Sequence, residues 1–367
     1  MINVSEPLLG KKELEYVNEC ISSGWVSSKG KFILQFEEKW ARYCGRKYGV
    51  AVSNGTVALQ AAVKALDLPY GSEVIIPDFT IISCALAVIY NGLIPVSVDA
   101  APETWTIDPD KIEESITDKT RAIMPVHIYG HPCDMDKIIN IAEKYGLKII
   151  EDAAEAHGAE YNGKKCGSFG EMSTFSFYAN KIVTSGEGGM ILTDQEEYYE
   201  RLKSIRNLSF GVEERFVHED LGHNFRITNM QAAIGVAQVE KIEEHIEIKR
   251  RIAAAYKERL SGHKGLIMPV EKEWAKNVYW VFPVVINEVK NITAKTISDE
   301  LRKKEIDTRP FFKGMHEQPV LSNVETFKNK KYPVCSAISE YGLYLPSGLT
   351  LSNDDVDYIC HVMKEII

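Results

Sequence analysis

Short apolar runs alternate with amphipathic stretches through the first two thirds of the chain. The runs are rich in Val and Ile, which is typical of buried strands. The stretches between them carry apolar residues at helical spacing. This pattern predicts strands over residues 48–53, 73–77, 95–99, 122–127 and 147–151, and helices over residues 56–66, 83–90 and 135–145.

The order of these elements predicts the fold class. Alternating strands and helices build an α/β domain around a mainly parallel, doubly wound sheet. Sheets of this kind bind ligands at the carboxyl ends of their strands. We therefore expect the functional residues to lie where the predicted strands end.

The pattern changes after Thr193. Residues 194–226 are polar, and we expect them to be irregular. Thr228 can then cap a long helix, or a kinked pair of helices, that runs to about Leu260.

The last third of the chain predicts a smaller α+β unit. Its features are an apolar run over residues 279–286, a helix over residues 294–304 and the segment 306–312. We expect the aromatic residues of the apolar run, Tyr279, Trp280 and Phe282, to pack in the core of this unit.

The length of 367 residues fits two domains. We predict a large domain over residues 1–250, which includes an N-terminal helix around residues 11–21, and a small C-terminal domain over residues 251–367. Hydrophobic residues make up 45% of the chain and charged residues 26%, which excludes global disorder.

The charge balance narrows the class of partner. Lys and Arg number 43 against 52 Asp and Glu, which gives a net charge of −9. A dedicated nucleic-acid binder usually needs a basic face, so we expect no nucleic-acid partner. Small anionic ligands remain possible, because backbone amides and a few local cations can hold them.

Cysteine usage and hydropathy point to the compartment. The 7 cysteines are scattered, odd in number and never spaced as Cys-x-x-Cys, so a disulfide scaffold or zinc site is not expected. The histidines likewise lack the spacing of a helical metal site, and we expect no metal. The chain shows no apolar signal core at its start and no run long enough to span a bilayer. We expect a cytoplasmic protein without a membrane partner.

Two residues between positions 147 and 193 suggest a reaction. The strand over residues 147–151 leads into Asp152, and Lys181 follows the apolar run STFSFYAN. Burial lowers the pKa of a lysine, and Schiff-base chemistry needs a neutral amine. An aspartate at the strand end could keep a pyridinium nitrogen protonated. Taken singly, the two residues are better explained as a surface-turn lysine and a capping aspartate.

A third feature is the sequence Ser53-Asn54-Gly55-Thr56, which joins a predicted strand to a predicted helix. Free amides at a helix start form a natural phosphate site, although plain helix capping would explain the same residues. Together, a phosphate site, a strand-end aspartate and a lysine after a strand are what a phosphorylated aldehyde cofactor requires.

Longer strings carry a family resemblance. EDAAEAHG, GSFGEMSTFSFYANK and GEGGM resemble the signature of the DegT/DnrJ/EryC1/StrS aminotransferases, and so do SSGWVSSKGKFILQFE, PVHIYGHPCDMD, HNFRITNMQAAIGVAQ and DTRPFF. The likeness covers nearly the whole chain. It implies a fold-type-I enzyme that uses pyridoxal 5′-phosphate (pyridoxamine phosphate in one half-reaction) to aminate keto-sugars carried on nucleotides.

The resemblance also implies roles for individual residues. Lys181 would carry the cofactor and shuttle a proton, Asp152 would pair with the pyridine nitrogen, and Glu155 would approach the ring hydroxyl. The phosphate would be held by Gly55, Thr56 and Ser176, with Asn224 donated by the neighbouring subunit of a homodimer. Arg309 and His316 would face the nucleotide-sugar, although a structural ion pair explains Arg309 equally well.

One position departs from the family pattern. Relatives place an aromatic residue after the Thr of P-x-x-T, where it stacks on the pyridine ring, but this chain has Ile81. Either an aliphatic contact suffices or Phe79, two residues earlier, substitutes for the missing ring.

The resemblance implies a reaction in two halves. L-Glutamate would give its amino group to the cofactor and leave as 2-oxoglutarate. The 4-keto carbon of a nucleotide-linked 4-keto-6-deoxy sugar would then be aminated, for O-antigen or other glycan biosynthesis. The strings WVSSKG, HPCDM, GHNFRITN and TRPFF favour GDP-4-keto-6-deoxy-mannose as that sugar.

Several alternatives remain at this point. UDP- or dTDP-linked sugars, aminated at C4 or C3, share the same motifs. A non-catalytic, cofactor-binding regulatory protein could use the same scaffold. Dehydratase relatives lack the lysine, so Lys181 argues against that branch. A nicotinamide dehydrogenase would need G-x-G-x-x-G, which the sequence SNGTVAL does not provide.

Overall fold

The computed structural model describes residues 1–211, 214, 216–287, 292–328 and 330–367. Over these residues the largest sheet has seven strands in the order β1-β9-β8-β5-β4-β2-β3. Their bounds are β1 Tyr48–Val52, β2 Glu73–Pro77, β3 Ile94–Val98, β4 Thr120–Ile123, β5 Lys148–Asp152, β8 Met172–Ser176 and β9 Gly189–Thr193. Strand β9 is antiparallel to β1 and β8, and the other pairs are parallel. The predicted mainly parallel sheet is therefore confirmed.

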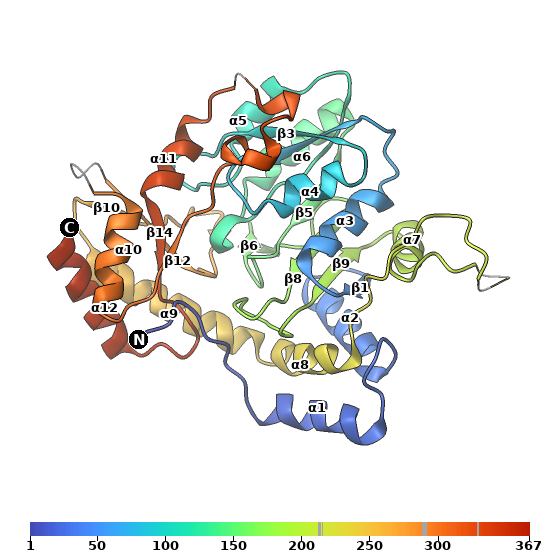
Figure 1. Cartoon of the computed structure of the whole chain (residues 1–367), viewed down its shortest axis with the longest axis horizontal. Helices are drawn as coiled ribbons and strands as arrows, with labels where there is room; N and C mark the ends of the chain where they lie inside the picture. The colour runs from blue at the N-terminus through green and yellow to red at the C-terminus, as the bar shows by residue number, and fades with distance from the viewer. Residues whose placement is uncertain (212–213, 215, 288–291, 329) are drawn as a thin grey trace.

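Helices cover both faces of this sheet. Residues alternate along each strand, so Val50 and Val52 of β1 pack with one set of helices while Ala51 packs with another. The helices are α2 Lys31–Tyr43, α3 Gly55–Ala65, α4 Ser83–Ile89, α5 Pro109–Ile112, α6 Met135–Tyr145, α7 Glu196–Arg206 and α8 Asn229–Val239. Helix α1, Lys11–Ser23, lies against α8 below the sheet in Figure 1.

The expectation that residues 194–226 are irregular was wrong for α7. Only Leu202 and Ile205 of this helix are buried, so the sequence carries too short an apolar stripe to signal it. Residues 212–213 and 215 of the same stretch lie outside the described residues.

After Thr228 the sequence predicts either one long helix or a kinked pair, and the structure has the kinked pair. Thr228 caps α8, since its hydroxyl accepts from the N–H of Gln231 at 3.2 Å. The break lies at Glu240 and Lys241, and α9 then extends over Ile242–Leu260. In Figure 1, α9 runs from the large sheet to the group of elements at the C-terminal end of the chain.

A second sheet occupies that end. Its order is β10-β12-β14-β13, with bounds β10 Leu266–Ile267, β12 Phe282–Ile286, β14 Gly342–Leu345 and β13 Arg309–Pro310, and all its pairs are antiparallel. It packs with the second half of α9 and with α10 Ala294–Lys303, α11 Pro333–Tyr341 and α12 Asn353–Ile366. Both chain termini lie here in Figure 1, where Ile2 pairs with Ile306.

Helix α9 and a small third sheet connect the two parts of the chain. Residue 250 lies inside α9, which contributes to the cores of both parts. A small sheet joins β11 Ala275–Lys276 to β6 Glu160–Tyr161, which in turn pairs with β7 Lys164–Lys165. The domain boundary at residue 250 stays a prediction.

Two properties of the whole chain complete the description. Among the described residues, no helix combines the length and apolar character needed to cross a bilayer. All the cysteines are buried and carry free thiols.

Candidate active site

A cavity of about 570 Å³ opens where β5 and β8 end and α3 begins. The predicted residues Gly55, Thr56, Asp152, Glu155, Ser176 and Lys181 all line it. Asn54, Thr80, Ile81, Ser83, Asn180, Trp280, Phe312 and Tyr344 also contribute to its walls. The site therefore lies at the carboxyl edge of the sheet, as the fold class predicts.

The start of α3 forms one end of the cavity. The side chain of Asn54 caps the helix by accepting from the N–H of Val57 at 3.0 Å. The first N–H groups of a helix have no partner inside it, which leaves the amides of Gly55 and Thr56 available. A Cβ on Gly55 would lie 2.7 Å from the Cβ of Ser176, so only glycine lets the helix approach the end of β8 this closely. The amides and nearby hydroxyls fit a phosphate group.

Asp152 provides a buried carboxylate in the same cavity. It is 1% exposed, and burial raises its pKa. Its two oxygens accept from the N–H of Ala154 at 3.0 Å and from the thiol of Cys84 at 3.4 Å. A protonated pyridine nitrogen is the kind of cationic donor that such a carboxylate can stabilise.

Lys181 and Glu155 face each other in the cavity. The Nζ of Lys181 lies 3.8 Å from Oε1 of Glu155. Burial lowers the pKa of Lys181 and raises that of Glu155, so burial disfavours the charged form of both groups. The other carboxylate oxygen of Glu155 accepts from the N–H of Tyr129 at 2.7 Å, which fixes its position.

One further polar atom suggests that the cavity holds a ligand. The side-chain oxygen of Asn180 is buried and has no hydrogen-bond partner among the described residues. Unpaired buried acceptors are costly, and a bound molecule can supply the missing donor. The residues present therefore fit a phosphorylated pyridine aldehyde: amides for its phosphate, Asp152 for its nitrogen and Lys181 for its carbonyl.

Sequence reasoning missed Trp280. Tyr279 and Phe282 pack in the core of the second sheet, as expected, but the ring of Trp280 lies over Nζ of Lys181 at 3.5 Å from its centroid. The apolar run around Trp280 is hydrophobic on both faces, so periodicity could not show which residue points into the cavity.

The structure also distinguishes Ile81 from Phe79. Ile81 lines the cavity. Phe79 is 1% exposed and packs instead against Tyr129, Phe311 and Phe312. Ile81 therefore lies at the cavity and Phe79 does not, so Phe79 is not placed to substitute for a ring there.

Two predicted residues lie away from the cavity of this chain. Asn224 is exposed and pairs through its backbone with Asn207 at the end of α7. Arg309 is also exposed, and its guanidinium binds both carboxylate oxygens of Asp307 at 2.6 and 2.7 Å.

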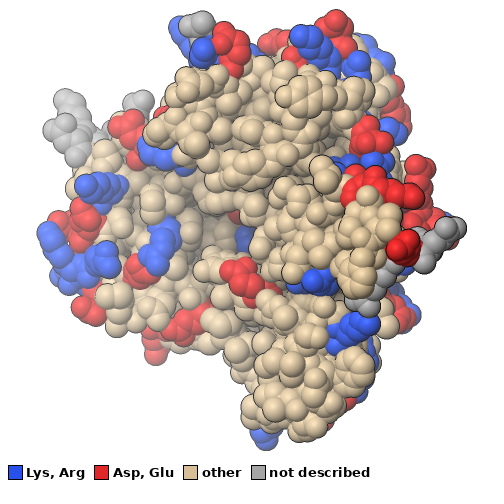
Figure 2. All heavy atoms as spheres, turned by 45° about the vertical axis from the view of Figure 1, so that its right-hand side comes forward, with Lys and Arg blue, Asp and Glu red and all other residues tan. Residues whose placement is uncertain are grey.

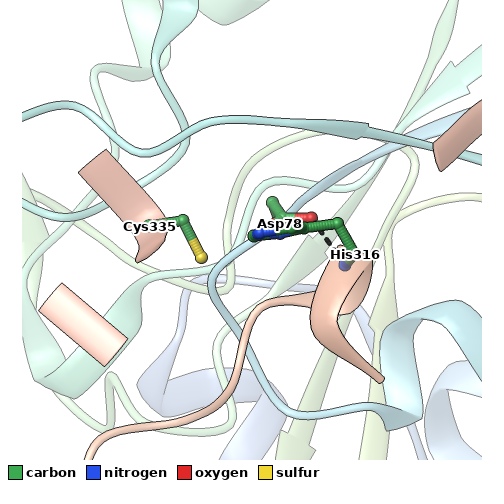
Figure 3. Close-up of side chains that lie close together, drawn as sticks. All are labelled: Asp78, His316 and Cys335. Carbon is green, nitrogen blue, oxygen red and sulfur yellow. Dashed lines mark hydrogen bonds and ion pairs between the residues drawn. The ribbon is translucent and has the colours of Figure 1, made fainter. Parts of the chain in front are cut away.

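His316 does not line the cavity either. It lies in a short 3-10 helix, Met315–Glu317, and its Nδ1 bonds to the carboxylate of Asp78 at 2.6 Å (Figure 3). Cys335 approaches from α11 (Figure 3), and a Cβ on Gly314 would lie within 2.5 to 2.8 Å of a polar atom of each of the three residues. Gly314 therefore fills the space between them, and the cluster fastens this segment to the end of β2.

The fold and the cavity together define a fold-type-I pyridoxal-phosphate-dependent aminotransferase. The profile of the DegT/DnrJ/EryC1/StrS aminotransferase family matches residues 7–364, and the chain belongs to that family. It is thus an enzyme of a family of pyridoxal-phosphate-dependent sugar aminotransferases.

Known relatives align over almost the full length. The chain is 42% identical to GDP-perosamine synthase of Escherichia coli O157:H7, over 99% of this chain and 98% of that protein. It is 36% identical to dTDP-3-amino-3,6-dideoxy-alpha-D-galactopyranose transaminase of Aneurinibacillus thermoaerophilus, over 96% and 95%. The crystal structure of S. venezuelae DesV superposes with a TM-score of 0.90 at 32% identity, covering 96% of this chain and 94% of that one.

Proposed function

We propose that this enzyme transfers an amino group from L-glutamate to the 4-keto carbon of a nucleotide-linked 4-keto-6-deoxy sugar. The favoured substrate is GDP-4-keto-6-deoxy-mannose and the product GDP-perosamine, for O-antigen or other glycan synthesis in the cytoplasm. The observation that carries the proposal is one cavity that holds Lys181, Asp152 and the start of α3. The 42% identity to a GDP-perosamine synthase supports the choice of sugar.

Bound pyridoxal phosphate would supply an electron-withdrawing ring that stabilises negative charge at the reacting carbon. Asp152 would hold the proton on the pyridine nitrogen, and Glu155 would lie toward the ring hydroxyl. The amides of Gly55 and Thr56 and the hydroxyl of Ser176 would bind the phosphate. Nζ of Lys181 accepts a proton in one step of the amino transfer and returns it in a later step. General acid–base catalysis of this kind raises the rate about 10²–10⁴-fold.

The proposal includes a homodimer with shared sites. Asn224 is exposed and outside the cavity of its own chain, which leaves it free to reach the phosphate site of a partner subunit. We assign Arg309 to the nucleotide-sugar on the family pattern alone. His316 we assign to the same region, where its bond to Asp78 would leave it a positioning role.

A second candidate keeps the chemistry and changes the sugar. The 36% identity to a dTDP-3-amino-3,6-dideoxy-alpha-D-galactopyranose transaminase favours a dTDP-linked 3-keto sugar as the alternative. The two candidates differ in the nucleotide and in the carbon that receives the amino group.

A substrate panel separates these candidates. The purified enzyme, with pyridoxal phosphate and L-glutamate, is offered GDP-, UDP- and dTDP-linked keto-sugars, and the aminated products are followed by mass spectrometry. We expect GDP-4-keto-6-deoxy-mannose to be the best substrate. A stronger preference for a dTDP- or UDP-linked sugar, or for a 3-keto sugar, would replace the proposed substrate.

Lys181→Ala is the control for the reaction class. We expect this variant, and also Lys181→Arg, to lose turnover on every sugar together with the visible absorbance of the bound cofactor. Normal turnover in either variant would refute the transamination mechanism itself.

A further inference from the structure

Trp280 reaches the cavity from the segment just before β12, a hundred positions along the chain from Asn180. Its indole face lies over Nζ of Lys181, at 3.5 Å from the ring centroid. The indole N–H donates to the backbone oxygen of Asn180 at 2.8 Å, next to the lysine. The ring therefore contacts both the amine and the backbone that carries it.

The backbone of Trp280 is itself held at two places. A Cβ on Gly130 would lie 3.0 Å from the nitrogens of Tyr279 and Trp280, so this turn and the Trp280 segment are in close contact. The preceding residue, Tyr129, donates its N–H to Glu155, the carboxylate partner of Lys181. Trp280 and Glu155 are thus positioned around the amine by the same turn.

Lys249 of α9 provides the second support. Its Nζ donates to the backbone oxygen of Trp280 at 2.8 Å and to that of Ser347. Lys249 is 2% exposed, and burial lowers its pKa to about 7. A buried lysine bonded to carbonyls is costly, which argues for a positioning role rather than a surface charge.

We propose that Trp280 is a further catalytic residue, whose indole face holds the amine of Lys181 in the cavity and favours its protonated form. The inference rests on the proposed function, since it matters in the steps where Lys181 is not bonded to the cofactor and carries the transferred proton. The ring quadrupole attracts an ammonium group and not a neutral amine, so the contact strengthens as Nζ gains its proton. Lys249 acts through Trp280 and is a positioning residue.

Neighbouring charges and burial also act on the protonation of Lys181. Glu155 and Asp152 favour its protonated form, and burial opposes it. Burial, with the nearby Lys181, lowers the pKa of His157 to about 3, so His157 adds no charge at neutral pH. The face of Trp280 is a further group in contact with the amine.

The test measures the protonation of Lys181 directly in the cofactor-free full chain. Trace acetic anhydride reacts only with the neutral amine, and mass spectrometry of the Lys181 peptide follows its labelling against pH. The midpoint of the curve reports the pKa, while the plateau reports access. A change in access alone therefore leaves the midpoint in place.

We expect Trp280→Leu to lower the midpoint by between about half a unit and one and a half units. Trp280→Phe keeps a smaller aromatic face and guards against a folding defect, with less than about half of that shift. Lys249→Met should shift the midpoint in the same direction by a smaller amount. Trp274 packs on Tyr161 and His131, away from the cavity, so Trp274→Leu is the matched control and should leave the midpoint unchanged.

An unchanged midpoint in both Trp280 variants would overturn the inference, and so would an equal shift in Trp274→Leu. Because labelling needs no cofactor or sugar, it separates this inference from the proposed function. A shifted midpoint in a protein that aminates no sugar of the panel would leave the contact standing and refute its catalytic meaning.

Discussion

At the scale of single residues, Asp152 illustrates how a site can be built at the expense of stability. Its carboxylate is buried beside two neutral donors, an N–H and a thiol, and no cation of the described residues forms an ion pair with it. Burying a carboxylate in this way is unfavourable until a cationic group binds beside it. The same side chain should therefore weaken the empty protein and strengthen cofactor binding.

Asp152→Asn tests both effects together. We expect its dissociation constant for pyridoxal phosphate to rise about 10- to 150-fold, the loss of one charge-assisted hydrogen bond. The free energy of unfolding of the cofactor-free protein should stay equal or increase. Fluorescence titration gives the first quantity and urea unfolding the second. Cys84→Ala, which removes only the neutral thiol donor, should change the affinity by less than about threefold.

A lower free energy of unfolding for Asp152→Asn, together with a dissociation constant that does not rise, would contradict the proposed role of Asp152.

The residues of the site differ in how far the sequence could predict their position. Asp152 and Gly55 follow predicted strands, and the carboxyl ends of parallel strands meet at one edge, so their proximity follows from the fold class. Trp280 could not be found in this way, because its contact with Lys181 depends on how the second sheet packs against the first. The bond of His316 to Asp78 is equally non-local and left no signal in the spacing.

At the scale of elements, the segment from β13 to α11 closes one wall of the site. Phe312 of this segment lines the cavity, and His316 fastens it to Asp78 at the end of β2. Further along, the N–H of Cys335 donates to Asp99 at 2.9 Å, and Tyr332 bonds to Ser97 at 2.7 Å. These bonds join α11 to β3 and to the residue that follows it.

The bond to Asp78 makes this attachment dependent on pH. The hydrogen bond to Asp78 raises the pKa of His316 above its usual value of 6.5. A group whose pKa is raised by folding contributes stability that is complete below its unfolded pKa and is lost as the pH rises through its folded pKa. The contribution should therefore be full below about pH 6.5 and fade above it.

His316→Gln should lower the free energy of unfolding by about 1–2 kcal/mol at pH 6. This is the contribution of a charged hydrogen bond, reduced because the pair is partly exposed to solvent. The difference from the unchanged protein should shrink by pH 8.5. Urea unfolding at the two pH values measures it. His361→Gln, at an exposed pair with Glu365, should leave the pH dependence as it was. A loss in free energy of unfolding that grows toward high pH would contradict a stabilising ion pair between His316 and Asp78.

The helices show where local sequence signals fail. The apolar spacing and the cap at Thr228 predicted α8 and α9, because both features lie within the elements themselves. Helix α7 buries only Leu202 and Ile205 and is otherwise charged or polar along its exposed side. Its stability comes from packing on the sheet, which a sequence pattern does not contain.

At the scale of the whole molecule, several large apolar side chains near the start of the chain are exposed. Leu14 on α1, Trp25 in the following connection and Leu34 on α2 are 64%, 56% and 68% exposed. In Figure 2 the lowest part of the molecule, at the height of α1 in Figure 1, is largely free of charged side chains on the face shown. Apolar surface of this kind marks protein contacts, which supports the proposed homodimer.

Mixed dimers test whether the sites are shared. Lys181→Ala and Asn224→Ala should each be poorly active alone, the first through its own lysine and the second through its partner's phosphate site. After the two are unfolded and refolded together, half of the dimers are mixed and each holds one intact site. We expect activity to recover to about a quarter of that of the unchanged enzyme. No recovery, with mixed dimers verified by mass, would mean that each chain builds its site alone.

The buried cysteines allow the opening of the molecule to be followed in time. Each thiol is buried, so a reagent in solution reaches it only when the structure around that thiol opens. Cys84 reports on the contact of α4 with Asp152, and Cys335 on the attachment of α11. The order in which the thiols become modified would rank these elements by the free energy needed to open each one.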